Sequence, residues 1–166
     1  MEEHFSNLRV NSGAPTMLVH SFIKKLLGRK KKSAIINVSS IASNAPLPYM
    51  GVYSASKRFL TIFSNSLQDN YGNQIDIQDF TPGYVTTKIS NFHKGPDSIS
   101  PEECVQKSIR DLGQEFTCVP VISHSMNAQI FHTLYRHATP LFQIFIGGFI
   151  ENLALSQFYR EFKKEN

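Results

Sequence analysis

The sequence is short of several features that mark whole classes of protein. It has two cysteines among 166 residues, Cys104 and Cys118, and neither lies in a CxxC or Cys/His ligand spacing. This argues against a disulfide framework and a zinc site, and favours a reduced, cytosol-facing environment. No apolar run approaches the roughly 20 residues that a membrane-spanning helix needs. The nearest, at 140–150, is about half that length and is not expected to cross a membrane, although it could lie on one. Residues 1–4 lack the pattern of a secretion signal.

Charge of neither sign dominates. Lys and Arg number 17 against 13 Asp and Glu, and 41% of the residues are hydrophobic. This composition is typical of one ordinary globular domain and excludes collagen-like, coiled-coil and wholly disordered chains. Most of the basic excess lies at 29–32 and 163–164. Such runs can attract nucleic acid or an anionic membrane, but a solvated turn and a charged tail explain them as simply. Nucleic acid is therefore not expected as a partner.

Apolar residues recur with helical or strand spacing along most of the chain. The pattern predicts helices at 15–27, 53–71 and 101–112, strands at 34–38, 75–80 and 116–122, and a weakly periodic, mostly helical remainder at 125–166. Gly28 and Gly72 follow the first two helices, as C-terminal caps do. Ser100-Pro101 is a typical start for the third. Strands that alternate with helices indicate an α/β fold with a parallel sheet covered on both faces.

The first strand, at 34–38, is the most apolar of the three. Its apolar side chains point both ways, which predicts a strand buried on both faces. No strand precedes it in the chain, so its outer edge would be open and hydrophobic, which natural proteins avoid. The sequence therefore reads as the second half of a larger doubly wound domain. On its own, this chain is expected to be marginally stable or aggregation-prone.

Tyr53 and Lys57 form the sharpest chemical feature. On a helix they lie one turn apart on one face, and a positive charge there favours the phenolate form of the tyrosine. Ser40 follows the first strand, at the carboxyl edge where parallel sheets bind their ligands. Its hydroxyl could hydrogen-bond the substrate oxygen with which Tyr53 exchanges a proton. A Tyr-x-x-x-Lys pair alone is a weak signal, because such pairs also serve packing and solubility.

Three motifs together carry a family resemblance. Asn-Val-Ser-Ser at 37–40, Tyr-Ser-Ala-Ser-Lys at 53–57 and Pro-Gly-Tyr-Val-Thr-Thr at 82–87 have the order and spacing of the short-chain dehydrogenase/reductase superfamily. The chain most resembles its 17-beta-hydroxysteroid dehydrogenase / very-long-chain 3-oxoacyl-CoA reductase family. The resemblance implies the second half of a Rossmann-like domain at 1–124 and a helical substrate-cap extension at 125–166. It also implies NADP(H)-linked reduction of a 3-oxoacyl-CoA or keto-steroid carbonyl to the alcohol, in lipid metabolism such as fatty acid elongation.

The resemblance further implies a role for each motif residue. Tyr53 would be the catalytic acid in reduction, Lys57 would favour its phenolate and bind the nicotinamide ribose, and Ser40 would orient the substrate oxygen. Asn11 resembles the family's fourth residue, which holds a water that links Lys57 to a proton relay; a helix cap or turn residue is the other interpretation of Asn11. The cofactor would be bound by Lys57 and by a loop whose matching residues are Pro82, Gly83, Val85 and Thr87.

One family motif has no counterpart. The TGxxxGxG loop that receives the cofactor pyrophosphate is absent, and the only glycine near the N-terminus is Gly13. The choice of NADP(H) over NAD(H) therefore rests on the resemblance alone. An independent enzyme needs this loop, whereas a dimer partner does not. The alternative is a catalytically incomplete chain that pairs, as a homo- or heterodimer, with a full-length relative through the helices at 15–27 and 53–71.

The remaining signals concern metals and location. The three histidines His124, His132 and His137 lack a ligand spacing, so no metal is expected. Lys163 and Lys164 lie at the third and fourth positions before the C-terminal end of the sequence and match a KKxx retrieval signal. Together with the resemblance, this signal predicts that the protein is located at the cytosolic face of the endoplasmic reticulum, with peripheral membrane contact. Without the signal, a cytoplasmic location is expected.

Overall fold

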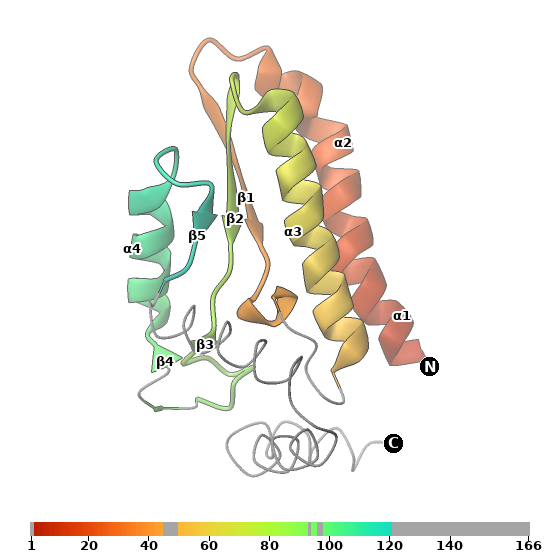
Figure 1. Ribbon diagram of the computed structural model, residues 1–166, viewed down its shortest axis with the longest axis vertical. Helices are drawn as coiled ribbons and strands as arrows, with labels where there is room; N and C mark the ends of the chain where they lie inside the picture. Colours follow the sequence, from red (N-terminus) through yellow and green to blue (C-terminus); the bar gives the residue numbers. More distant parts are fainter. Residues whose placement is uncertain (1, 45–49, 93, 96–97, 121–166) are drawn as a thin grey trace, which may run out of the picture.

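The computed structural model describes residues 2–44, 50–92, 94–95 and 98–120 (Figure 1). Its elements in chain order are α1 (Glu2–Leu8), a π-helical turn (Arg9–Gly13), α2 (Ala14–Leu27), β1 (Ser33–Val38), a 3₁₀ turn (Ile41–Ser43), α3 (Gly51–Tyr71), β2 (Ile75–Phe80), β3 (Tyr84–Val85), β4 (Ser98–Ile99), α4 (Pro101–Asp111) and β5 (Thr117–Cys118). The three helices and first two strands predicted from the sequence are confirmed to within two residues at each end.

Several predictions fall wholly or partly outside the described residues. These are the helical remainder at 125–166, the domain boundary after 124, the segment 140–150, and Lys163 and Lys164. The third strand, predicted at 116–122, is described as a strand only at Thr117–Cys118. In the described part, no helix combines the length and apolarity needed to span a bilayer.

The three main strands form one parallel sheet in the order β1-β2-β5. β1 and β2 pair along their whole length, from Ser33 opposite Ile75 to Val38 opposite Phe80. Helices α2 and α3 cover one face of this sheet and α4 lies against the other (Figure 1). The predicted α/β fold with a parallel sheet is thereby confirmed. A second, two-stranded parallel sheet of β3 and β4 was not predicted, because two-residue strands leave no periodic pattern.

The described core has two apolar clusters, one on each side of β2. Ile75 and Ile77 pack with Leu67 beneath α2 and α3, while Phe80 packs with Ile99, Cys104 and Cys118 beneath α4. Alternate side chains of a strand point to opposite faces, so one strand supplies both clusters. β2 is therefore the central strand of the described sheet.

The prediction that the first strand is buried on both faces is wrong for the described residues. Ile36 is 38% exposed and Val38 is 51% exposed, because the described helices cover only the α2–α3 face of β1. The predicted open edge is confirmed, since β1 pairs with β2 alone among the described strands. An apolar groove of about 470 Å³ runs along this edge between α2 and β1, lined by residues that include Leu18, Phe22 and Ile35.

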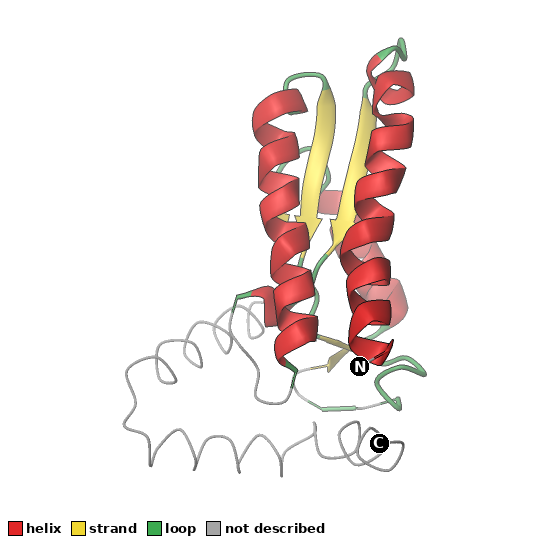
Figure 2. Cartoon of the chain, turned by 90° about the vertical axis from the view of Figure 1, so that its right-hand side faces the viewer, coloured by secondary structure: helices red, strands yellow, loops and turns green. Residues whose placement is uncertain are grey.

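Helical residues precede Pro15, where the sequence predicted the start of the first helix. α1, the π-helical turn and α2 form one helical segment that runs beside α3, in front of the strands in Figure 2. Proline at the first turn usually marks a helix start. Here the Ala14 N–H donates to the Arg9 carbonyl, five residues back, so the π turn widens the helix just before Pro15. This spacing accommodates a residue that has no N–H to donate.

Candidate active site

The site is built where β1, β2 and α3 meet. Parallel strands end at the same edge of a sheet, so the segments that follow β1 and β2 lie side by side. The Ser39 N–H donates to the Phe80 carbonyl at 2.7 Å, and the Ile41 N–H donates to the Pro82 carbonyl at 3.1 Å. The first turns of α3 lie at the same edge and bring Tyr53 and Lys57 to it (Figure 1).

Tyr53 and Lys57 face one another, as their spacing predicts. The Lys57 ammonium lies 5.8 Å from the centre of the Tyr53 ring. Its Nζ donates to the Val38 carbonyl at 3.0 Å, which joins the lysine to the last residue of β1. Both side chains are half-buried. Burial lowers the pKa of Lys57, because desolvation penalises the ammonium form.

A hydroxyl pair holds this part of α3 against β1. The Ser39 hydroxyl donates to the Lys57 carbonyl at 3.0 Å and lies 2.9 Å from the Thr61 hydroxyl. Both side chains are buried, so the backbone of Lys57 is fixed relative to the end of β1. Neither Ser39 nor Thr61 was predicted from the sequence. The signal available for Ser39 was its position beside Ser40, directly after an apolar strand.

Ser40 begins the 3₁₀ turn and is only 9% exposed. Its hydroxyl oxygen accepts from the Ala42 N–H at 3.2 Å, which caps the turn and orients the side chain. A hydroxyl that accepts one hydrogen bond keeps its own proton for donation. Ser40 can therefore donate to a ligand oxygen at this edge of the sheet.

Asn11 lies in the π-helical turn and contacts Ser56, near the start of α3. Its Nδ2 donates to the Ser56 hydroxyl at 3.2 Å, and that hydroxyl donates to the Tyr53 carbonyl at 2.7 Å. Pro15, four residues after Asn11, has no N–H to donate to the Asn11 carbonyl. The amide of Asn11 is thus tied to the Tyr53 segment through Ser56, a fully buried residue that the sequence analysis missed.

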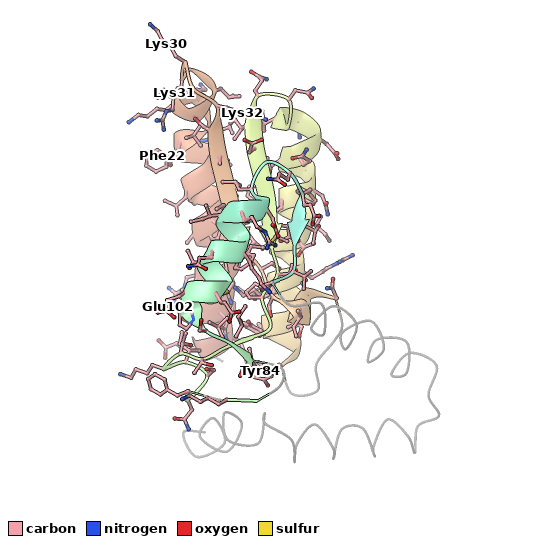
Figure 3. The ribbon with its side chains drawn as sticks, turned by 90° about the vertical axis from the view of Figure 1, so that its left-hand side faces the viewer. Phe22, Lys30, Lys31, Lys32, Tyr84 and Glu102 are labelled. Atoms are coloured by element: carbon pink, nitrogen blue, oxygen red, sulfur yellow. The ribbon has the colours of Figure 1, made fainter. Side chains whose placement is uncertain are left out.

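The loop after β2 is held together by one serine that sequence reasoning also missed. The Ser90 hydroxyl donates to the Val85 carbonyl at 2.6 Å and accepts from the Thr87 N–H at 3.0 Å. The Thr87 hydroxyl itself reaches the Val85 carbonyl at 3.3 Å. Pro82 and Gly83 lead from the end of β2 into β3, which begins at Tyr84 (Figure 3), and the segment held by Ser90 follows β3. Ser90 therefore fixes the geometry of Val85 and Thr87, two of the five residues predicted to meet the cofactor.

A buried carboxylate lies next to the site without serving it directly. Asp79 of β2 is fully buried, and neither carboxylate oxygen has a hydrogen-bond partner among the described residues. Burial raises the pKa of Asp79, and the nearby Thr61 hydroxyl and Arg58 charge oppose this only in part. Within the described part of the chain, no group of His, Cys, Asp and Glu could hold a metal ion.

The comparisons with known proteins decide the family. The family described as short chain dehydrogenase matches residues 2–95, more than half of the sequence. The chain belongs to the short-chain dehydrogenase family. The very-long-chain 3-oxoacyl-CoA reductase of Homo sapiens is 31% identical to this short-chain dehydrogenase over 107 residues, which cover 63% of this chain and 34% of that protein. The "Inactive hydroxysteroid dehydrogenase-like protein 1" of Mus musculus is 34% identical over 125 residues, which cover 72% of this chain and 38% of that protein.

The solved structures agree on the fold. A short chain dehydrogenase from Burkholderia cenocepacia, in complex with NADP, matches with a TM-score of 0.71 at 23% identity, over 84% of this chain and 60% of that one. The expected partial Rossmann-like fold and the expected likeness to 3-oxoacyl-CoA reductases are thus confirmed. This short-chain dehydrogenase spans about a third of the length of the curated relatives named above. Its family consists of oxidoreductases that act on alcohol and carbonyl groups.

Proposed function

We propose that this chain carries the proton-transfer half of a carbonyl reductase site, for NADP(H)-linked reduction of a 3-oxoacyl-CoA or keto-steroid to the alcohol. The observation that supports this most is the pairing of Tyr53 with Lys57, 5.8 Å from ring centre to ammonium, at the carboxyl edge of a parallel sheet. The likeness to a human very-long-chain 3-oxoacyl-CoA reductase favours an acyl thioester over a steroid.

Tyr53 is the acid in this proposal. It donates its phenolic proton to the carbonyl oxygen of the substrate, and the Lys57 charge stabilises the phenolate that remains. Ser40 donates a hydrogen bond to the same oxygen and holds it within reach of the tyrosine. Ser39 and Thr61 act as positioning residues, because they fix the backbone that carries Lys57.

Proton return to Tyr53 passes by way of Lys57 and Asn11. The Asn11 carbonyl receives no hydrogen bond from Pro15. It therefore has capacity to hold a water near the start of α3. The Asn11 amide, bonded to Ser56, fixes the residue against the backbone of Tyr53. We therefore include Asn11 as the fourth member of the proposed site.

In this proposal, Lys57 and the segment 82–87 bind the nicotinamide end of the cofactor. NADPH, when bound, supplies the hydride that reaches the carbonyl carbon. Lys57 would hold the ribose hydroxyls, Pro82 and Gly83 would flank the ring, and Val85 and Thr87 would meet the carboxamide after the Thr87 hydroxyl turns away from the Val85 carbonyl. The sequence offers no glycine loop for the pyrophosphate, so this end of the cofactor has no fitted residues in this chain.

The test measures cofactor binding and turnover separately on the 166-residue chain. NADPH binding is followed by fluorescence, and turnover by NADPH oxidation with a 3-oxoacyl-CoA. Tyr53→Phe should keep binding and lower turnover by about 10²–10⁴-fold, while Lys57→Met should weaken both. Tyr71→Phe, at the far end of α3, is the matched control and should change neither. Turnover that survives Tyr53→Phe would contradict the proposed role. Absence of NADPH binding by the unaltered chain would favour the second candidate.

The second candidate is a partner of a full-length relative. Helix α2 has no buried residue along its 14 positions, and Phe59 and Ile62 of α3 are 44% and 55% exposed. A mouse relative whose name describes it as inactive is consistent with non-catalytic members of this family. Mixing the chain with a full-length reductase should then change the reductase's activity and sedimentation. Phe59→Ser/Ile62→Ser should abolish both changes, and unchanged sedimentation on mixing would contradict this role.

Location at the cytosolic face of the endoplasmic reticulum is part of the proposal and rests on Lys163 and Lys164. A tagged chain should co-localise with an endoplasmic-reticulum marker. Lys163→Ser/Lys164→Ser should release it from that compartment, and an unchanged distribution would contradict retrieval by this signal.

A further inference from the structure

The charges of this chain are sharply segregated along the sequence. Between residues 4 and 68 there are nine Lys and Arg and no Asp or Glu, whereas the rest of the chain holds the other eight cations and all 13 acids. Six of the nine lie between residues 24 and 32, in the last turn of α2 and the turn that leads to β1. We name this set the basic end; its members are Lys24, Lys25, Arg29, Lys30, Lys31 and Lys32.

The basic end lies at one end of the described part of the chain, where its side chains are exposed. All six side chains are exposed, and in the described residues only Lys32 has an ion pair, with Asp76 at 2.5 Å. Lys30, Lys31 and Lys32 lie together at one end in Figure 3, with Tyr84 at the other. The six residues of β1, about 20 Å of strand, separate the basic end from Ser40 and the proposed site. The basic end is therefore not part of that site.

Large apolar side chains lie on the same helix as the basic end. Phe22 is 50% exposed and Leu18 is 58% exposed. Lys25 follows them by three and seven residues, so the three side chains share one side of α2. Phe22 projects outward from the helix in Figure 3. Apolar residues beside lysines on one side of a helix are the pattern of segments that lie in a membrane interface.

We propose that the basic end, with Phe22 and Leu18, is a docking surface for an anionic phospholipid membrane. A second copy is disfavoured, because a symmetric contact on this surface would set six cations against six. Five of the six cations are lysines, which act as compact point charges and do not need a planar, bidentate partner. An anionic bilayer attracts each nearby lysine without requiring fixed geometry.

The experiment is flotation of the 166-residue chain with phosphatidylcholine vesicles, with and without phosphatidylserine. The chain should bind only the anionic vesicles, and added salt should weaken binding because it screens exposed charges. Lys30→Ser/Lys31→Ser should weaken binding on the order of tenfold or more. Phe22→Ser should remove the part of the binding that persists at high salt. Circular dichroism of each variant checks that the helices are retained.

The matched control is Lys88→Ser/Lys94→Ser, which removes the same charge from exposed positions in the loop at the other end of the molecule. This variant should bind anionic vesicles as the unaltered chain does. Three outcomes would overturn the proposal: no binding to anionic vesicles, an equal loss in both double variants, or preferential binding of single-stranded RNA over anionic vesicles through the same lysines. The last outcome would assign the basic end to nucleic acid instead.

Discussion

β1 and β2 are neighbouring parallel strands of six residues each. Their burial is the opposite of what their compositions suggest. β1 reads Ser-Ala-Ile-Ile-Asn-Val and leaves Ile36 and Val38 exposed, while β2 reads Ile-Asp-Ile-Gln-Asp-Phe and is largely buried. The more polar strand thus occupies the centre of the described sheet. Position between α3 and α4 decides burial here, and the polar Gln78 of β2 is buried where it gains hydrogen-bond partners.

The largest effect on stability is expected when one isoleucine from each strand is replaced and the two losses are compared. Ile77→Ala should lower the free energy of unfolding by about 2–5 kcal/mol, because it leaves a cavity beneath α3. Ile36→Ala should lower it by less than about 1 kcal/mol, because that side chain is already 38% exposed. Urea unfolding of both variants measures the difference. Equal losses would mean that Ile36 is covered in solution.

The next comparison concerns the polar residues of β2 that are partnered. Gln78 is fully buried; its side-chain amide donates to the Ser108 carbonyl at 3.1 Å and accepts from the Ser108 hydroxyl at 2.7 Å. Ser108→Ala should cost about 1–3 kcal/mol, because it leaves the Gln78 oxygen without a donor. Gln78→Met/Ser108→Ala should recover part of the loss, since both partners are then apolar. A double-mutant cycle without coupling would contradict this account.

The two aspartates of β2 should respond to neutralisation in opposite directions. Burial raises the pKa of Asp79 above its ordinary value, so the folded state resists ionisation there. Stability is unaffected below the unfolded pKa of about 3.9 and falls as the pH rises through the raised, folded pKa. Asp79→Asn should therefore stabilise the protein at neutral pH by about 1 kcal/mol or more and flatten this pH dependence.

Asp76→Asn is the matched control in the same strand. It removes the ion pair with Lys32, in which the side chains are 25% and 52% exposed, and should cost at most about 1 kcal/mol. Thermal unfolding of both variants between pH 4 and pH 8 measures the contrast, a window set by the reference pKa of a free aspartate. Destabilisation by Asp79→Asn at neutral pH would show that the Asp79 carboxylate has a partner in solution.

The smallest effect on stability is expected at the open edge and exposed face of β1. Ile36→Lys should leave the free energy of unfolding nearly unchanged and reduce concentration-dependent association, because lysine discourages strand-to-strand pairing. Light scattering over a concentration series measures this. A monomeric chain that melts cooperatively without the substitution would contradict the expected instability of the open strand.

The elements of the fold were predictable where the sequence has a strong period. Helix 53–71 and strand 75–80 were located because their apolar spacing and terminal glycine are local signals. The start of α2 was predicted to within one residue, but the helical residues before it were missed. Pro15 resembles a first-turn proline, and the π turn before it depends on backbone spacing that no periodicity reports. The exposure of Ile36 was missed because it depends on which neighbours are present.

The residues of the candidate site also divide into those that the sequence predicts and those that only the structure shows. Motifs in the sequence predict Tyr53, Lys57 and Ser40, because their positions on a helix and after a strand depend only on residues nearby in the chain. Ser56 and Thr61 are not, because small hydroxyl residues on a helix give no signal until packing brings partners to them. Ser90 acquires its role only when the loop folds back on Val85.

The sequence by itself determined the order of helices and strands, the face shared by Tyr53 and Lys57, and the family motifs, because all of these depend on residues close together in the chain. Only the tertiary structure decided that the polar β2 is central and the apolar β1 lies at the edge. It also decided that the Asp79 carboxylate is buried without a hydrogen-bond partner among the described residues, and that Asn11 bonds Ser56 of α3 across 45 residues. Burial and long-range hydrogen bonds are set by what packs against a residue, and the chain's local pattern does not contain that information.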